Sequence, residues 1–367
     1  MEKLGFGFLR LPRKNLLDEF STDDVLLRQM VDLYVQRGGT YFDTAFNYLS
    51  GESECALNRC VISRYPRQRL CIADKLPSWL VTCKEDCQRI FDTQLQRTGA
   101  GYFDVYQLHW LNAANYAQAL KFDQFAFIAR QKQAGLVGKI GFSFHDSAAL
   151  LDEILTAHPE MDYVQLQLNY LDWENPIVQA RACYDVARKH RKPIIVMEPV
   201  KGGTLAQVPP EAAQAFSAAD PALSPSQWAL RYVAALPGVE RVLSGMSTLE
   251  QVEENTADFS PALPEHEPVF EAASRIIQEK IAIGCTGCGY CQSGCPARIP
   301  IPRYFSLYNE YARKRTDDWK LRPLYAALAQ EGGRASACIG CGQCEAHCPQ
   351  RLSIQKYLKK VARALEE

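Results

Sequence analysis

Short apolar runs alternate with longer amphipathic stretches along the first 260 residues of the chain. The runs are five to nine residues long, which is typical of strands, whereas apolar positions in the longer stretches follow a helical pattern. Eight strand–helix alternations in about 250 residues predict a (β/α)8 TIM barrel, an α/β fold. The predicted strands are residues 5–9, 40–45, 70–75, 102–110, 139–145, 163–170, 193–199 and 241–246.

Two of the helical stretches carry clear boundary signals. One would begin at an N-cap of Ser21 or Thr22. Another would run from Thr82 as N-cap to Gly99 as its C-terminal stop. A Rossmann fold shares the alternation of strands and helices, but its GxGxxG signature is absent. The nearest sequence, GFGFLR, leads into a proline turn and not into a helix.

Eight of the fourteen cysteines stand after residue 284, in two runs of the form C-x2-C-x2-C-x3-C-P. This is the bacterial ferredoxin run, in which thiolates hold [4Fe–4S] clusters and the fourth cysteine of each run ligates the other cluster. Zinc is the alternative, but it favours pairs of C-x2-C, which leave the third cysteine of each run unexplained. The first cluster would be held by Cys285, Cys288, Cys291 and Cys348, and the second by Cys338, Cys341, Cys344 and Cys295.

Residues 284–352 therefore resemble a two-cluster ferredoxin. From Pro296 to the end there are thirteen Lys and Arg residues against seven Asp and Glu residues. A four-thiolate cluster carries negative charge, so surplus basic side chains would offset it. A solvated helical face is the plainer interpretation of the same charges. The aromatic-rich segment between the two cysteine runs is expected to pack within the small domain or to dock that domain on the barrel.

Four side chains suited to acid–base chemistry stand at consecutive predicted strand ends, where barrel enzymes carry their active sites. Asp43 and Tyr48 follow the second strand, Lys75 ends the third and His109 ends the fourth. A phenol has a pKa of about 10, and a nearby ammonium lowers it. Tyr48 could then protonate a carbonyl oxygen as hydride reaches the carbon, with Asp43 holding Lys75 charged and His109 orienting the carbonyl.

The chain resembles the aldo-keto reductases in the order and spacing of several segments. These segments are YFDTAFNYLSGESECALN, ADKLP, YQLHW, GKIGFS, YVQLQLNY, MEPVKGGTLA and VLSGMSTLEQVEEN, and they span nearly all of residues 1–256. The resemblance implies an NAD(P)H-dependent carbonyl reductase with Tyr48 as the acid, supported by Lys75, Asp43 and His109.

The same resemblance implies a set of cofactor-binding residues. Ser143 and Gln165 would hold the nicotinamide carboxamide, and Met197 stands where an aromatic residue usually stacks on the ring. Phe144 replaces the usual asparagine, and Ser247 stands where NADP-preferring members often have arginine, the natural partner of a 2′-phosphate. Phosphate would be bound by Lys201, Gly202 and Gly203, and the adenosine half by Gly245, Ser247, Gln251, Glu254 and Asn255.

Composition narrows the choice of partners and location. The net charge of −1 gives no reason to expect nucleic acid or an anionic membrane as partner. No apolar run reaches the roughly 18 residues of a membrane-spanning helix, and the first residues do not resemble a signal peptide. The expectation is a soluble cytoplasmic protein, and the six scattered cysteines are expected to be buried thiols.

The expected organisation is a barrel over residues 1–260, a linker and connecting helix over 261–283, and a small α-rich ferredoxin-like iron–sulfur domain over 284–367. The first functional hypothesis is a reductase that exchanges electrons with an external carrier of the ferredoxin or flavodoxin type. Clusters move single electrons and nicotinamide moves hydride, so a flavin or a radical-tolerant substrate would have to link them. The alternatives are an ordinary NAD(P)H carbonyl reductase with structural clusters, and a redox sensor with a non-catalytic barrel.

Overall fold

The computed structural model describes residues 2–15, 18–257, 259, 262, 264–313 and 318–366. The chain divides into two compact units, each formed from two segments. The barrel unit comprises Met1–Val200 and Ser226–His266, and the cysteine unit comprises Lys201–Pro225 and Glu267–Glu367. The segment Lys201–Pro225, which follows the seventh strand, therefore belongs to the same unit as the cysteine runs.

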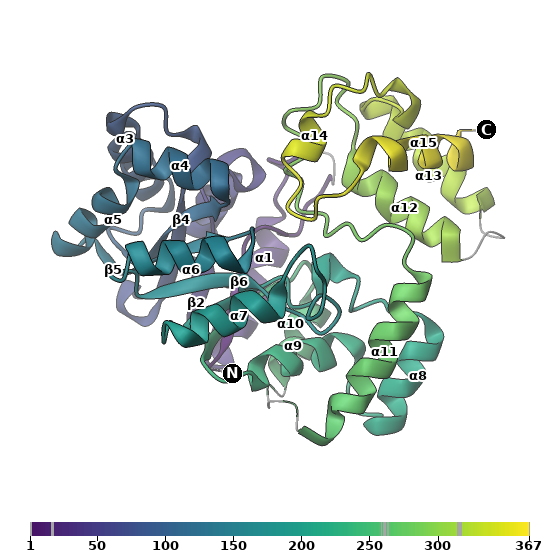
Figure 1. Ribbon diagram of the computed structural model, residues 1–367, viewed down its shortest axis with the longest axis horizontal. Coiled ribbons are helices and arrows are strands. Elements are labelled where there is room, and N and C mark those ends of the chain that lie inside the picture. The colour runs from purple at the N-terminus through teal and green to yellow at the C-terminus, as the bar shows by residue number, and fades with distance from the viewer. Residues whose placement is uncertain are drawn as a thin grey trace. The chain divides into compact units, whose positions relative to one another are not determined.

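The barrel unit is built on a closed sheet of eight parallel strands in sequential order, with α4 to α7 on its outer side in Figure 1. The first and last strands pair through Gly7 and Gly245, which closes the sheet. All eight predicted strands are confirmed, with ends shifted by no more than three residues. The strands are β1 Leu4–Gly7, β2 Tyr41–Asp43, β3 Cys71–Pro77, β4 Phe103–Leu111, β5 Val137–Phe144, β6 Tyr163–Gln167, β7 Ile194–Met197 and β8 Val239–Gly245.

Helices cover the outside of the barrel and begin at residues other than the predicted N-caps. The Asp23 carboxylate, and not Ser21 or Thr22, caps α1, because it accepts hydrogen bonds from the second and third backbone N–H groups beyond it. Cys83 holds the N-cap position of α3, where the Asp86 carboxylate accepts from the Cys83 N–H. These helices are α1 Asp24–Gln36, α2 Glu52–Leu57, α3 Lys84–Thr98, α4 Ala113–Lys121, α5 Gln124–Gln133, α6 Ala148–Ala157, α7 Ala180–Lys189, α9 Pro225–Ala235 and α10 Leu249–Ala257.

A layer of apolar and aromatic side chains fills the barrel interior. Because side chains alternate across a strand, the residue two positions further on points to the same inner face. That next layer begins the candidate site at the C-terminal end of the strands. The filling layer consists of Tyr41, Ala73, Val105, Tyr163, Ile195 and Leu243.

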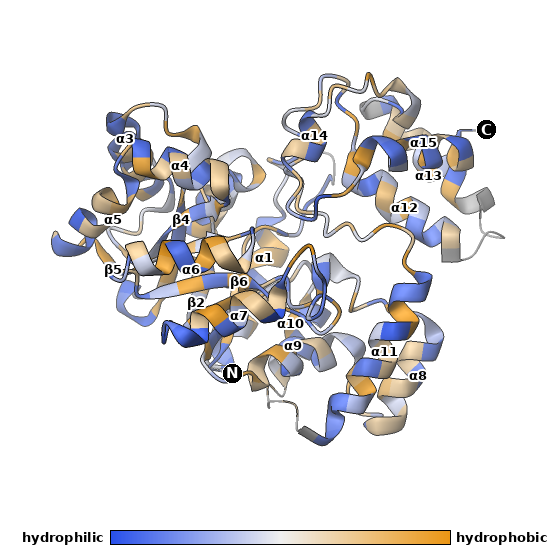
Figure 2. Ribbon diagram, in the orientation of Figure 1, coloured by the Kyte–Doolittle hydropathy of each residue, from blue (hydrophilic) through white to orange (hydrophobic). Residues whose placement is uncertain are grey.

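The cysteine unit is made of helices joined by irregular loops. Its helix α11 (Glu267–Lys280) lies beside α8 (Pro210–Ala219), with Phe216 and Phe270 in edge-to-face contact. Figure 2 shows hydrophobic and hydrophilic residues in turn along α11, as expected for a helix with one packed face. The remaining helices of this unit are α12 Ile301–Arg313, α13 Asp318–Glu331, α14 Gln343–Ala346 and α15 Ile354–Leu365.

A second hydrophobic core belongs to the cysteine unit alone. Tyr304, Phe305 and Tyr325 come from the segment between the cysteine runs, and they are buried against α15. The predicted packing role of that segment is thus confirmed. Part of the predicted linker, residues 261 and 263, lies outside the described residues, and α11 is the helix that was expected within it. Among the described residues, no helix is both long and apolar enough to cross a membrane.

Candidate functional site

The inner layer at the C-terminal end of the barrel contains Gln107 and six of the residues that the sequence singled out. Each of them lies two positions after a member of the filling layer, apart from Ser143, which lies two positions after Gly141. The periodicity of the strands therefore brings residues from seven strands, β2 to β8, to one level. The residues of this layer are Asp43, Lys75, Gln107, Ser143, Gln165, Met197 and Gly245.

Lys75 and Asp43 form a buried ion pair in this layer. The Lys75 Nζ lies 2.6 Å from the Asp43 Oδ2 and 2.5 Å from the carbonyl oxygen of Thr44. The Lys75 side chain is 0% exposed, so the ammonium is compensated only by protein groups. Burial raises the pKa of the Asp43 carboxyl, and the Lys75 ammonium opposes that rise. Lys75 was expected to end its strand, but β3 continues to Pro77.

Tyr48 begins a tight turn, Tyr48–Gly51, five residues after the end of β2. The Lys75 Nζ lies 4.7 Å from the centroid of the Tyr48 ring. The three residues after Tyr48 have positive φ angles, 49° at Leu49, 52° at Ser50 and 93° at Gly51. Left-handed backbone at non-glycine residues is costly and is common where a fold must fix a functional side chain. The turn keeps Tyr48 8% exposed at the edge of the buried pair.

His109 completes the four-residue set from β4. Its ring lies 5.7 Å from the Tyr48 ring and 5.3 Å from the Trp79 ring, centroid to centroid. Burial, the Lys75 ammonium and His145 hold the pKa of His109 well below its usual value. The imidazole is therefore neutral at pH 7 and carries one N–H donor. The structure thus brings together all four residues of the predicted acid–base set.

The predicted carboxamide-binding residues lie on the opposite side of the same layer. The Ser143 Oγ accepts from the backbone N–H of Trp110 at 2.7 Å, which leaves its own O–H to donate. The Gln165 Oε1 accepts from Gln107 at 2.9 Å, while its Nε2 has a contact of 3.5 Å with the Met197 sulfur. A weak sulfur contact leaves amide hydrogens available, so these residues fit a carboxamide ligand.

The residues around the end of β8 form a group of three hydrogen-bonded pairs. The Ser247 N–H donates to the Gln251 Oε1 at 2.7 Å, and the Asn255 amide reaches the Ser244 hydroxyl at 3.2 Å. The Ser226 hydroxyl donates to the Glu254 carboxylate at 2.5 Å.

Arg10 was not singled out in the sequence, yet it lies within this group. Its side chain would meet a Cβ at Gly245 within 3.2 Å, and its carbonyl accepts from the Ser247 hydroxyl. Arg10 follows β1, so the rule of strand ends could have found it.

Lys201, Gly202 and Gly203 belong to the cysteine unit and not to the barrel unit. Gly202 has a φ of 64° and lies so close to the backbone of Thr286 that a Cβ there would be 2.0 Å from the Thr286 oxygen. Thr286 stands between the first two cysteines of the first run. The predicted phosphate-binding loop therefore packs against a cysteine loop.

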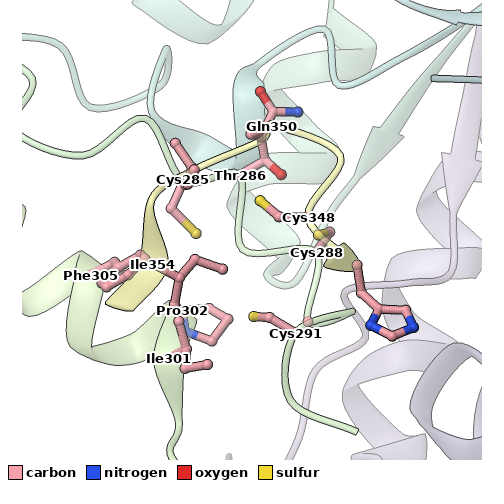
Figure 3. A pocket seen from close by; sticks show the side chains of 13 residues that line it. Cys285, Thr286, Cys288, Cys291, Ile301, Pro302, Phe305, Cys348, Gln350 and Ile354 are labelled. Atoms are coloured by element: carbon pink, nitrogen blue, oxygen red, sulfur yellow. The ribbon is translucent and has the colours of Figure 1, made fainter. Parts of the chain in front are cut away.

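Four cysteines line one cavity of the cysteine unit, here called the first cavity. They are Cys285, Cys288, Cys291 and Cys348, and Figure 3 shows their sulfurs directed toward a common space. Burial, together with the three neighbouring cysteines, raises the pKa of the Cys291 thiol. Thr286, His347 and Gln350 also line this cavity. The apolar part of its wall comes from Ile301, Pro302, Phe305, Leu352 and Ile354.

The second cavity is lined by Cys295, Cys338, Cys341 and Cys344. The two cavities thus group the eight cysteines in the two sets of four expected from their spacing, with one cysteine of each run crossing to the other cavity. Among the described residues, no three His, Cys, Asp or Glu side chains converge closely enough to bind a single metal ion. Four sulfurs around a cavity suit a polynuclear cluster, whereas zinc needs each sulfur about 2.3 Å from one centre.

Comparison with protein-family models gives two matches. The model described as the aldo/keto reductase family matches residues 3–268. The model described as a 4Fe-4S dicluster domain matches residues 284–352. The chain therefore carries a 4Fe-4S domain after its barrel. A search of curated proteins found no match.

Solved structures of similar fold cover the barrel. An aldo-keto reductase from Bacillus halodurans, in its holo form, is 21% identical, with a TM-score of 0.58 over 74% of this chain and 91% of its own. One from Klebsiella pneumoniae, in complex with NADPH, is 18% identical, with a TM-score of 0.57 over 74% of this chain and 91% of its own. One from Brucella melitensis is 20% identical, with a TM-score of 0.55 over 73% and 93%.

Proposed function

This chain belongs to the aldo/keto reductase family, and from that premise we propose that it reduces the carbonyl group of a small molecule with Tyr48 as proton donor. Family membership makes the chain an oxidoreductase. The observation that carries the proposal is the buried pair of Lys75 and Asp43, with the Lys75 Nζ 4.7 Å from the Tyr48 ring centroid.

The pair prepares Tyr48 to release a proton. Asp43 and the Thr44 carbonyl hold the buried Lys75 ammonium in place. A fixed positive charge beside a phenol favours the phenolate, so the proton passes more readily to a carbonyl oxygen. The neutral imidazole of His109 donates an N–H to that same oxygen and stabilises the negative charge that develops on it.

The opposite side of the layer orients the cofactor. A bound nicotinamide, from NADP(H) or NAD(H), supplies the hydride that reaches the carbonyl carbon. The free donor of Ser143 and the amide of Gln165 would fix the carboxamide and so decide which ring face meets the substrate. The NADPH-bound relative from Klebsiella pneumoniae supports the choice of nicotinamide.

The cysteine unit would hold two [4Fe–4S] clusters, one in each cavity, for electron transfer. The donor set of each cavity fits, since each has four thiols and apolar walls. Hydride transfer to the carbonyl oxidises the nicotinamide, and two electrons from two reduced clusters, together with one proton, would reduce it again. A flavin in the barrel would join single-electron and two-electron chemistry. In the alternative, the clusters have only a structural role.

Replacement of Tyr48 by phenylalanine tests the acid role. NADPH oxidation with 4-nitrobenzaldehyde as the probe should fall by about 10²- to 10⁴-fold, the usual contribution of a positioned acid. Tyr41→Phe is the matched control. Tyr41 belongs to the filling layer, one layer below the site in the barrel interior, and its hydroxyl has no hydrogen-bond partner among the described residues. Equal activity of wild type and Tyr48→Phe would refute the acid role.

Anaerobic reduction tests the electron-transfer role. Addition of NADPH or NADH to the cluster-loaded protein should bleach the visible absorbance of the clusters and produce the EPR signal of a reduced cluster. A bound flavin would appear in the same spectrum. If only a strong chemical reductant bleaches the clusters, the structural role is favoured instead.

A further inference from the structure

The geometry points to an electron-entry surface beside the second cavity, and we propose that it docks a small acidic one-electron carrier protein of the flavodoxin or ferredoxin type. This inference rests on the proposed electron-transfer role of the clusters. It adds the place of entry, the cluster that receives the electron and the charge of the partner. The surface is formed by the exposed face of α15 and the loop between Cys338 and Cys341.

The exposed face of α15 is wholly basic. Four residues of this helix are exposed, and each of them is lysine or arginine. The apolar side of the same helix is buried in the core of the cysteine unit. The four exposed residues are Lys356, Lys359, Lys360 and Arg363.

Among the described residues near this face, Glu345 and Glu366 are already engaged in hydrogen bonds. The Glu345 Oε1 accepts from the backbone N–H of Gln355, and Glu366 accepts from the Ser336 N–H and from the Tyr325 hydroxyl. Arg334 is exposed on the turn before Ser336 and lies near enough to Glu366 to lower the pKa of that carboxyl. Five exposed basic residues against these two carboxylates leave the described part of the surface with an excess of positive charge.

The basic helix forms one wall of the second cavity. Gln355 and Leu358, from its first two turns, line that cavity together with Cys341. Cβ atoms at Gly340 and Gly342 would each lie 3.6 Å from the Gln355 amide, so the cysteine loop rests on the start of α15. A charge on this helix is thus close to the group that the cavity would hold.

The second cavity also has the most exposed cysteine of the two cavities. All eight cavity cysteines are described, and only Cys341 among them is exposed. Ile339, between Cys338 and Cys341, is 71% exposed, the highest value among the exposed large hydrophobic residues of the described chain. An apolar centre with a charged rim is the usual anatomy of a protein–protein contact. Weak electron-transfer contacts need little buried area, which suits a single helix and loop.

A carrier protein explains the surface better than a lipid membrane does. A helix that binds a membrane must insert its apolar side, and that side of α15 is occupied by the core. A negatively charged carrier would be steered to the basic face at long range and then held at Ile339. In each encounter the reduced carrier loses one electron and the cluster in the second cavity gains it, without transfer of a proton. Two encounters would supply two electrons, which with one proton would reduce the oxidised nicotinamide that a carbonyl reduction leaves behind.

Charge reversal on the helix tests the proposal. The probe is fully reduced flavodoxin, an acidic protein, mixed anaerobically with the cluster-loaded full-length enzyme, and its oxidation is followed by rapid mixing through its flavin absorbance. We expect Lys356→Glu/Lys359→Glu to slow this reaction by about tenfold or more at low salt, and added salt to slow the wild type. The matched control is Arg69→Glu/Lys121→Glu, which makes the same change in net charge at exposed residues of the barrel unit.

A second variant addresses the apolar centre. Ile339→Asp adds a negative charge where the carrier would touch, so it should also slow electron transfer from flavodoxin, whereas Ile339→Lys should slow it less. Photoreduced deazaflavin, a small uncharged donor, should reduce the clusters at the same rate in every variant. That rate and the iron content show that the clusters of each variant are intact.

The outcomes separate this proposal from the function on which it rests. Equal rates with flavodoxin in the helix variant and in the control would overturn the docking surface. Binding to anionic vesicles that is lost in the helix variant, with unchanged flavodoxin rates, would assign the face to a membrane and overturn it too. Helix-dependent cluster reduction without any reduction of the barrel's substrate would sustain the docking surface and refute the coupling of clusters to the barrel.

Discussion

The two candidate sites of this chain differ in what completes them. In the barrel, Lys75 finds Asp43 and the Thr44 carbonyl as partners within the fold itself, so the charged group is fixed before any ligand arrives. In the cysteine unit, four thiols face a cavity, and burial raises the pKa of thiols such as Cys291 and Cys344. Packing therefore prepares the barrel site before a ligand binds. The thiols of the cysteine unit, in contrast, must lose their protons when they bind iron.

Removal of iron should break this comparison most strongly. Because cluster binding and folding are coupled in a small ligand-rich domain, the anaerobic apoprotein should lose amide protection throughout α12 and α15. The barrel strands should keep theirs. Hydrogen exchange read by mass spectrometry measures both regions in one sample. Equal protection of α15 with and without iron would show that its core of Tyr304, Phe305 and Val361 suffices.

Loss of one partner in the barrel should have the next largest effect. Lys75→Met leaves the Asp43 carboxylate buried without its cation, which costs about 3–5 kcal/mol in free energy of unfolding. Protonation of Asp43 relieves that cost, so the destabilisation should be smaller at pH 5 than at pH 8. Denaturant unfolding of the barrel at both values checks this. A loss that is equal at the two pH values would contradict it.

A methyl group at Gly202 should disturb the cysteine unit but not the barrel. In Gly202→Ala the Cβ would lie 2.0 Å from the Thr286 oxygen, and relief of that overlap should cost about 1–3 kcal/mol. Gly203→Ala is the matched control, because its φ is also positive and no atom lies within 4 Å of its Cβ. Thermal unfolding and iron content measure the difference, and equal losses in both variants would show that the contact is not tight.

Low pH should reduce the stability of the barrel through His109, and this is the smallest of the four expected effects. In the folded protein the pKa of His109 is held well below its usual value. Between this lowered pKa and the unfolded pKa of about 6.5, only the unfolded chain binds the proton. Stability should therefore fall as pH drops below about 6.5, by up to about 1.4 kcal/mol per pH unit. His109→Asn should flatten the profile, and parallel profiles would argue against a neutral buried imidazole.

The pattern of the sequence was sufficient for the barrel, because each strand is an apolar run of fixed period between turn residues. It was less informative for helix starts, where Asp23 and Cys83 replaced the expected caps. Several side chains satisfy the rule for an N-cap, and only packing decides which one is used.

For the site, strand ends predicted Asp43, Lys75 and His109, which the fold brings together. Contacts between distant segments were not predictable. Nothing in the spacing of residues indicates that Gly202 meets Thr286, or that Arg10 packs over Gly245. The roles of the predicted site residues as ligands or catalysts stay predictions.

The exchange of cysteines between the two cavities has a consequence for synthesis of the chain. The second cavity has its four cysteines once Cys344 has left the ribosome, and the first cavity, begun at Cys285, must wait for Cys348. The cavity that is begun first is completed last, within four residues of the other. A truncated product that ends between the runs would have three cysteines for one cavity and one for the other. Insertion of either proposed cluster would therefore have to wait for the second cysteine run, and a copy that ends between the two runs would complete neither cavity.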